Sequence, residues 1–226
     1  MYKLHYLGFN AKGNTPRAIL NYAQVKFENK LYTKDDLAEL KKLDNGLLEY
    51  KQVPILELPD GKRLSQAIAI NTYLSKKFNL YGDNDLEGSE ITSIFCTYED
   101  FWPKFRPIFF EVFDFEKGKQ DVFKKNFFDT FAPMYLSIYE RRFNQNNTGF
   151  IVGKRFSGAD IWLTAVLYNM FLNPARLEKY PEFEGVLVKH APNLGKQIIK
   201  FSENELKHYF DKSNKNGFIH NSNPLI

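Results

Sequence analysis

Apolar and polar side chains alternate strictly over Tyr2–Tyr6, at the start of the chain. A period of two is typical of a strand with one buried face, and Gly8 marks its end. Thr15 and Pro16 then suit an N-cap and a first helical position, and apolar residues follow at helical spacing over 19–23. The chain is therefore expected to open with a β-strand followed by an α-helix.

A second strand is predicted over 27–32, and the polar segment 33–48 reads as an irregular helix and loop. The turn sequence Pro-Asp-Gly-Lys at 59–62 separates two further apolar segments, 54–58 and 63–64. Pro-Asp-Gly favours a tight turn between antiparallel strands, so this region is predicted to form a β-hairpin.

Apolar residues recur at helical spacing between Gln66 and Phe78. The predicted order up to residue 80 is thus β-α-β followed by β-β-α, the thioredoxin-like pattern. We expect residues 1–80 to form one domain with this fold.

Beyond residue 82 the pattern is helical only, and residues 88–226 are predicted to form an all-α domain. In this domain Ser157 and Asp160 have the spacing of a capping box, with Phe156 and Ile161 at the hydrophobic-staple positions. Long helices are expected over 88–115, 120–143, 158–172 and 192–210, and the polar tail 211–226 is expected to lie on the surface or to be mobile.

Composition narrows the class of protein. The net charge is only +4, with 31 basic and 27 acidic residues interleaved, which argues against a nucleic-acid-binding stripe. No stretch has the roughly 20 consecutive apolar residues of a membrane helix, and the start of the chain does not resemble a signal peptide. The single cysteine, Cys96, suits a reducing compartment, so the expected location is cytoplasmic. We expect Cys96 to be a half-buried structural side chain.

Several separately spaced motifs resemble the cytosolic glutathione transferases, most closely the sigma class, which includes prostaglandin D synthases, detoxification enzymes and lens S-crystallins. The resemblance extends over essentially the whole chain. The motifs are Tyr2–Tyr6, Gln52–Leu56 followed by Asp60-Gly61, Leu64–Ile70 with Tyr73-Leu74, Glu99–Phe101, and Ser157–Asp160.

The resemblance implies that Tyr6 is the catalytic residue. A thiol with a pKa of about 8.5 is only a few per cent thiolate at neutral pH, and a hydroxyl that donates to the sulfur favours the charged form. Lys12 stands where the sigma class has an arginine that assists the thiolate. A lysine keeps the positive charge but lacks the planar fork of an arginine.

The resemblance also implies the contacts for the peptide part of glutathione. Gln52 and Val53 belong to a strand edge that pairs with the cysteinyl unit, with the peptide bond before Pro54 cis. Ser65 and Gln66 lie where a helix N-terminus takes the γ-glutamyl carboxylate. Ala67 departs from the family pattern, which has Ser or Thr there, so one hydroxyl contact is expected to be missing.

Lys41 matches a lysine that pairs with the glycyl carboxylate, and Leu37 replaces a frequent tryptophan. Asp100 matches a carboxylate that reaches the γ-glutamyl amine of glutathione in the partner subunit. Glu99 and Asp100 also match two acids of a metal site in the prostaglandin synthase, but Cys96 replaces the third, and hard cations prefer oxygen ligands. No metal is expected to be required.

The expected protein is a homodimeric glutathione transferase that uses glutathione as a co-substrate and conjugates its thiolate to apolar electrophiles, without nucleic-acid or membrane partners. Phe9, Trp102, Phe105 and Arg106 are candidates for the wall of the second-substrate site. Four alternatives remain. Two keep a glutathione-dependent reaction at the same site: isomerisation of a prostaglandin-like endoperoxide and reduction of organic peroxides. The other two are a non-catalytic S-crystallin-like protein that binds glutathione or other ligands, and an assembly domain of a translation complex.

Overall fold

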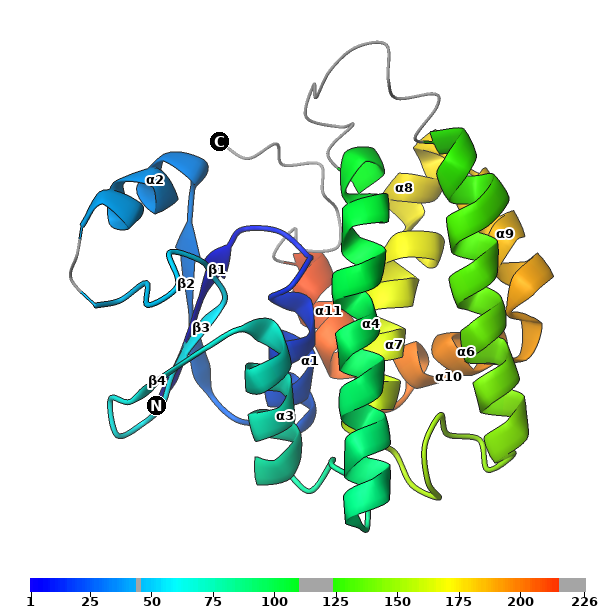
Figure 1. Ribbon diagram of the computed structural model, residues 1–226, viewed down its shortest axis with the longest axis horizontal. Coiled ribbons are helices and arrows are strands. Elements are labelled where there is room, and N and C mark those ends of the chain that lie inside the picture. Colours follow the sequence, from blue (N-terminus) through cyan, green and yellow to red (C-terminus); the bar gives the residue numbers. More distant parts are fainter. Residues whose placement is uncertain (44–45, 110–123, 216–226) are drawn as a thin grey trace.

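A computed structural model describes residues 1–43, 46–109 and 124–215 of the chain (Figure 1). Its first part is a four-stranded sheet with the strand order β2-β1-β3-β4. β1 pairs in parallel with β2 and antiparallel with β3, which in turn pairs antiparallel with β4. The elements are β1 (Tyr2–Leu7), α1 (Asn14–Tyr22), β2 (Phe27–Tyr32), α2 (Lys34–Lys42), β3 (Ile55–Glu57), β4 (Arg63–Ser65) and α3 (Ala67–Lys77). The thioredoxin-like prediction, including the hairpin, is confirmed.

The alternation at the start of the chain sets the register of the sheet. Leu4 of β1 pairs with Leu56 of β3, and both side chains are fully buried. They pack against Leu20 of α1 and Ile70 of α3, so these two helices cover one face of the sheet. In Figure 1, α1 and α3 lie between the sheet and the helical part of the molecule, whereas α2 lies at the outer side.

The second part of the described chain is helical. Helix α4 reaches Phe109, and the remainder of the predicted segment 88–115 lies outside the described residues, as do residues 120–123 of the next one. The elements are α4 (Asp85–Phe109), the π-helical turn η2 (Phe127–Phe131), α6 (Ala132–Asn146), α7 (Gly158–Leu167), a second π-helical turn η3 (Tyr168–Leu172), α8 (Pro174–Lys179), α9 (Glu182–His190), α10 (Pro192–Glu203) and α11 (Lys207–Lys215). In the described residues, no helix has the length and apolar character needed to cross a membrane.

Four local predictions were wrong. Helix α1 begins at Asn14 with Gly13 as its N-cap, so Thr15 lies inside the helix. The segment 192–210 is two helices, and α11 continues through 211–215, which were assigned to the tail. The side chain of Cys96 is exposed rather than half-buried. Each error concerns a boundary or an exposure that a local pattern determines only weakly.

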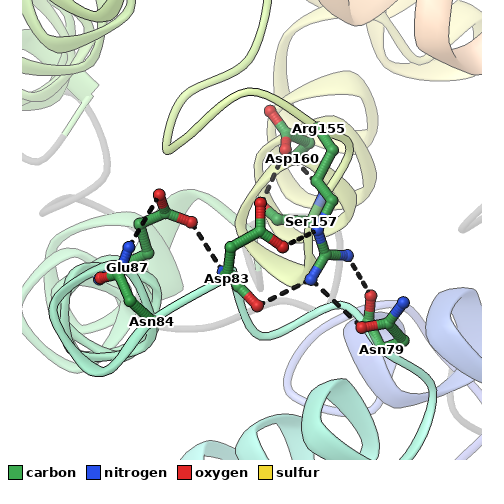
Figure 2. Close-up of polar contacts among 8 residues, drawn as sticks. Asn79, Asp83, Asn84, Glu87, Arg155, Ser157 and Asp160 are labelled. Atoms are coloured by element: carbon green, nitrogen blue, oxygen red, sulfur yellow. Dashed lines mark hydrogen bonds and ion pairs between the residues drawn. The ribbon is translucent and has the colours of Figure 1, made fainter.

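The junction between the two parts is a compact polar network around α7 (Figure 2). The predicted capping box is present: Asp160 accepts hydrogen bonds from the Ser157 backbone N–H at 2.9 Å and the Ser157 hydroxyl at 2.7 Å. A third bond comes from the backbone N–H of Ile151 at 2.9 Å. The neighbouring Arg155 donates to Asp83 Oδ1 at 2.6 Å and to the carbonyls of Asn79 and Gly82. These contacts tie the start of α7 to the segment that links α3 and α4.

Candidate functional site

Tyr6 lies near the end of β1, and its side chain is only 4% exposed. Its ring packs edge-on against Phe9 at a centroid distance of 5.8 Å, and the Cζ atom of Arg17 lies 5.4 Å from the ring centroid. The hydroxyl oxygen accepts a hydrogen bond of 2.9 Å from the backbone N–H of Lys12. Across residues 1–43, 46–109 and 124–215, no protein acceptor takes the hydroxyl proton of Tyr6. The hydroxyl is therefore held as an oriented donor.

Burial raises the pKa of Tyr6 to about 12, although the charge of Arg17 and the backbone N–H groups of Lys12 and Gly13 oppose the rise. At neutral pH the side chain is consequently the neutral phenol. It can donate a hydrogen bond to an anion, and it is not a base.

Gly13 makes the close approach of α1 to this ring possible. A Cβ atom built on Gly13 would lie 2.4 Å from Cδ1 and 2.6 Å from Cγ of Tyr6. These distances are far below the roughly 3.5–4.0 Å of a normal carbon contact. Only glycine fits between the helix start and the tyrosine as they lie here.

Lys12 connects the loop after β1 to the helical part of the molecule. Its ammonium donates to both carboxylate oxygens of Glu99 on α4, at 2.8 and 2.6 Å. Both side chains are partly exposed, so the pair is screened by solvent and contributes little stability. The pair nevertheless neutralises the charge of Lys12 locally, at a position next to the Tyr6 hydroxyl.

The N-terminus of α3 lies close to the same region. Its N-cap, Gln66, is exposed, has a φ of 72° and makes no side-chain capping hydrogen bond. Ala67 is buried and, with Lys12 and Glu99, lines a cavity of about 10 Å³. The buried Oδ1 of Asn71, which also belongs to the cavity lining, has no hydrogen-bond partner among the described residues. Such a cavity has room for about one water molecule.

The remaining predicted residues lie on several elements of the thioredoxin-like part. The Val53–Pro54 peptide bond is cis, as expected, and Val53 packs against the core cluster that contains Tyr6. Gln52 is exposed just before it, and Ser65 is half-buried at the end of β4. Lys41 is exposed on the peripheral helix α2, where no described contact joins it to Tyr6.

Asp100 is exposed on α4, where its charge raises the pKa of Tyr135 on α6, after the larger effect of burial. Among the candidates for the substrate wall, Phe9 and Phe105 are buried in the core, Trp102 is half-buried and Arg106 is exposed. Trp102 stacks on Tyr98 at 5.6 Å. Only Trp102 and Arg106 of the four present an accessible surface.

Two family models match the chain: glutathione S-transferase, N-terminal domain, over residues 2–76, and glutathione S-transferase, C-terminal domain, over residues 99–213. The chain belongs to the glutathione S-transferase family. Glutathione S-transferase 1 of Ascaris suum is 29% identical to it over 206 residues, which cover 88% of this chain and 96% of that one.

Solved structures agree with this assignment. The glutathione S-transferase from Ascaris lumbricoides superposes with a TM-score of 0.75 at 27% identity, covering 94% of this chain and 97% of the other. A monomeric glutathione S-transferase of the hookworm Necator americanus shares the fold, with a TM-score of 0.79 at 23% identity over 93% and 96% of the two chains. The protein is thus an enzyme of the transferase type, in a family that uses glutathione as co-substrate.

Two residues and one pairing around Tyr6 were not anticipated from the sequence. Gly13 gives no local signal beyond its position before a helix, and Arg17 looks like an ordinary polar residue of an amphipathic helix. The pairing of Glu99 with Lys12 joins residues 87 positions apart. All three depend on tertiary contacts: those of Gly13 and Arg17 lie within the thioredoxin-like part, and the Lys12–Glu99 pair joins the two parts.

Proposed function

We propose that the transferase holds glutathione with its sulfur at the Tyr6 hydroxyl, and that the resulting thiolate attacks an electrophilic carbon of an apolar co-substrate. The observation that carries this assignment is the geometry of Tyr6. Its oxygen accepts from the Lys12 backbone, its proton remains available, and burial keeps it as a phenol. A neutral donor of this kind favours the charged form of a thiol that it contacts.

The peptide part of glutathione would lie along the surface from the cis-Pro54 strand edge to the start of α3. The uncapped N–H groups at the N-terminus of α3 suit a carboxylate, because the helix dipole and the unpaired donors act together. The residues that we assign to glutathione binding are Tyr6, Lys12, Lys41, Gln52, Val53, Ser65, Gln66 and, from a partner subunit, Asp100.

We further propose a sigma-like cytoplasmic detoxification enzyme that acts as a homodimer. The exposed position of Asp100 on α4 is consistent with a role outside its own subunit. The fold itself does not require dimerisation, since the hookworm relative is described as monomeric.

Tyr6→Phe tests the central assignment, because it removes one hydroxyl and keeps the ring. We expect turnover in an aromatic-halide conjugation assay to fall by about 10- to 100-fold with little change in glutathione affinity, since the lost bond acts on the thiolate. Thiolate formation, followed by ultraviolet difference absorbance of bound glutathione, should require a higher pH. Unchanged turnover and an unchanged pH midpoint would remove Tyr6 from the mechanism. Tight glutathione binding without conjugation by the wild-type enzyme would instead indicate a non-catalytic binding protein.

Mixed dimers test the shared site. Asp100→Asn should raise the KM for glutathione more than it lowers kcat, because amine binding is similar in the ground and transition states. In a heterodimer of Tyr6→Phe and Asp100→Asn subunits, one site carries both defects and the other carries neither. Activity should then return toward half of the wild-type value at low glutathione. A fully active monomer in sedimentation experiments would exclude the shared site.

A further inference from the structure

Side-chain amides tie the loop after β1 to the helical part of the molecule at two points. Asn10 of the loop donates to Asn169 Oδ1 at 3.3 Å. Asn14, the first residue of α1, donates to the carbonyl oxygen of Ala165 at 2.8 Å. Asn169 donates to the same carbonyl oxygen, also at 2.8 Å. The loop and the helix start that follows it are therefore both fastened to the junction of α7 and η3.

The amides that make this link are buried. Asn10, Asn14 and Asn169 are 7%, 2% and 8% exposed, and Ala165 is fully buried. Tyr209 of α11, which is also buried, donates to Asn14 Oδ1. A hydrogen bond is stronger in such surroundings than in water, and a buried amide that loses its partner costs free energy. The link therefore resists displacement of the loop.

Asn169 is the second residue of η3, the π-helical turn that follows α7 directly. A π-helix has i→i+5 hydrogen bonds and occurs mostly as a single turn within an α-helix, frequently at a functional site. Here the amide nitrogen of Asn169 turns back to the carbonyl of Ala165, while its oxygen accepts from Asn10. The irregular turn thus coincides with the point at which the helical part contacts the loop.

The fastened loop carries the groups that enclose the Tyr6 hydroxyl. The backbone N–H of Lys12, two residues after Asn10, donates to that hydroxyl at 2.9 Å. Gly13, the residue before Asn14, lies against the Tyr6 ring. An N–H that donates to the tyrosine oxygen restricts the directions in which the hydroxyl can donate in turn. A shift of the loop would release this orientation.

We propose that Asn169 is a positioning residue for the transferase reaction: through Asn10 it holds the Lys12 backbone N–H against Tyr6, and so keeps the tyrosine hydroxyl aimed at the sulfur of glutathione. The inference rests on the proposed function of Tyr6 and extends it, since it gives the helical part a share in thiolate formation. The amides of Asn10 and Asn169 carry no charge, so their effect on the thiolate is one of position.

Asn169→Leu removes the amide and keeps a side chain of similar size, so the link to Asn10 is lost without a large cavity. A displacement of about 1 Å at a reacting group can lower a rate by about 100-fold. For the smaller shift expected here, kcat in the aromatic-halide conjugation assay should fall by about 10-fold. The KM for glutathione should change little. The thiolate fraction of bound glutathione at neutral pH, read from ultraviolet difference absorbance, should fall.

Asn146→Leu is the matched control, because it is the same substitution at another asparagine whose amide holds a loop. Asn146, at the end of α6, donates to the carbonyls of Phe150 and Gly153, each at 2.8 Å. Its Tm should fall, while kcat and the thiolate fraction stay at the wild-type values. If Asn169→Leu does not fold, Asn10→Leu replaces it with the same expectation, because it removes the same hydrogen bond from the side of the loop.

Combination with Tyr6→Phe tests the route by which Asn169 acts. Once the hydroxyl is removed, the Lys12 N–H has nothing to orient, so Asn169→Leu should lower the kcat of Tyr6→Phe by less than about 2-fold. A further loss of the full 10-fold or so would overturn the role of Asn169, because its effect would then not pass through the tyrosine.

The outcomes distinguish this inference from the proposed function. A Tyr6→Phe variant with unchanged turnover and an unchanged thiolate fraction overturns the assignment of Tyr6, and the role of Asn169 with it. A clear effect of Tyr6→Phe together with wild-type kcat and thiolate fraction in Asn169→Leu overturns only the role of Asn169. Equal losses of kcat in Asn169→Leu and Asn146→Leu also overturn it, because the effect then follows stability alone.

Discussion

Replacing Gly13 by alanine tests how tightly Tyr6, the proposed catalytic residue, is enclosed. The backbone of Gly13, with φ −82° and ψ −7°, suits alanine, so the substitution adds no conformational strain. The new methyl group would, however, lie 2.4 Å from Cδ1 of Tyr6. Carbon atoms in contact are separated by about 3.5–4.0 Å, so the ring or the helix start must move by about 1 Å.

The surroundings of Tyr6 leave the ring little room to move. Phe9 packs against it edge-on at 5.8 Å, and Arg17 lies behind it at 5.4 Å. Overpacking of this kind costs about 1–3 kcal/mol, from which the lower chain entropy of alanine in the unfolded state recovers about 0.4–1 kcal/mol. We expect a net loss of up to about 2.5 kcal/mol in the free energy of unfolding. Because a displacement of about 1 Å at a reacting group can lower a rate by about 100-fold, kcat/KM should fall by about 10- to 100-fold.

Urea denaturation and an aromatic-halide conjugation assay measure the two effects, and Gly8→Ala provides the control. Gly8 lies in the same loop, and a Cβ atom built there meets nothing within 4 Å. Stability and activity should therefore stay near wild-type values in Gly8→Ala. If Gly13→Ala matches Gly8→Ala in both assays, the close approach of α1 to Tyr6 is not a feature of the folded enzyme.

Three further predictions concern other parts of the molecule. Asp160→Ala removes the acceptor of three buried hydrogen bonds. The free energy of unfolding, measured by urea titration, should fall by on the order of 3–5 kcal/mol. A loss below about 1 kcal/mol would contradict the importance of this network for stability. Ala67→Ser should place a hydroxyl at the N-terminus of α3 and strengthen glutathione binding by about 1 kcal/mol in calorimetric titrations. Equal or weaker binding would show that Ser65 or water already supplies the hydrogen bond that the new hydroxyl would make. Burial lowers the pKa of His5, so the unfolded chain binds its proton more strongly than the folded one, and stability should fall as pH drops below about 6.5. His5→Gln should reduce this loss between pH 7.5 and 5.5, and identical pH profiles would contradict it.

The features that the sequence predicted well are those that short segments determine. Pro-Asp-Gly at 59–61 favours one turn type, and the hairpin of β3 and β4 forms around it. Ser157 and Asp160 are three residues apart, so their capping box needs only one helical turn. The alternation over Tyr2–Tyr6 likewise predicted a strand with a buried face, and Tyr6 is buried near the end of β1.

The features that the sequence did not reveal depend on distant contacts. Arg17 is buried because its guanidinium meets the carbonyls of a neighbouring loop and an amide of β2, and nothing in the pattern of α1 distinguishes it from a surface arginine. The short helices α8 and α9 did not stand out as a helical pattern. Phe183 of α9 is buried against an aromatic cluster contributed by other helices, including Phe105 and Phe171. Tertiary packing determines these elements more than local periodicity does.

The packing also shows that the site depends on both parts of the chain. Tyr6 and Phe9 come from the thioredoxin-like part, but they belong to a core cluster that otherwise consists mainly of residues from the helical part. Conversely, Tyr209 of α11 packs into the cluster that fills the space between the sheet, α1 and α3. Each hydrophobic core therefore contains side chains from both parts, and neither part can be removed without exposing the core of the other. Since residues of the helical part complete the cluster around Tyr6, part of the burial that raises the pKa of its hydroxyl comes from the union of the two parts. The environment of the Tyr6 hydroxyl is in this sense a property of the interface between the two parts, and the thioredoxin-like part alone would leave Tyr6 less buried.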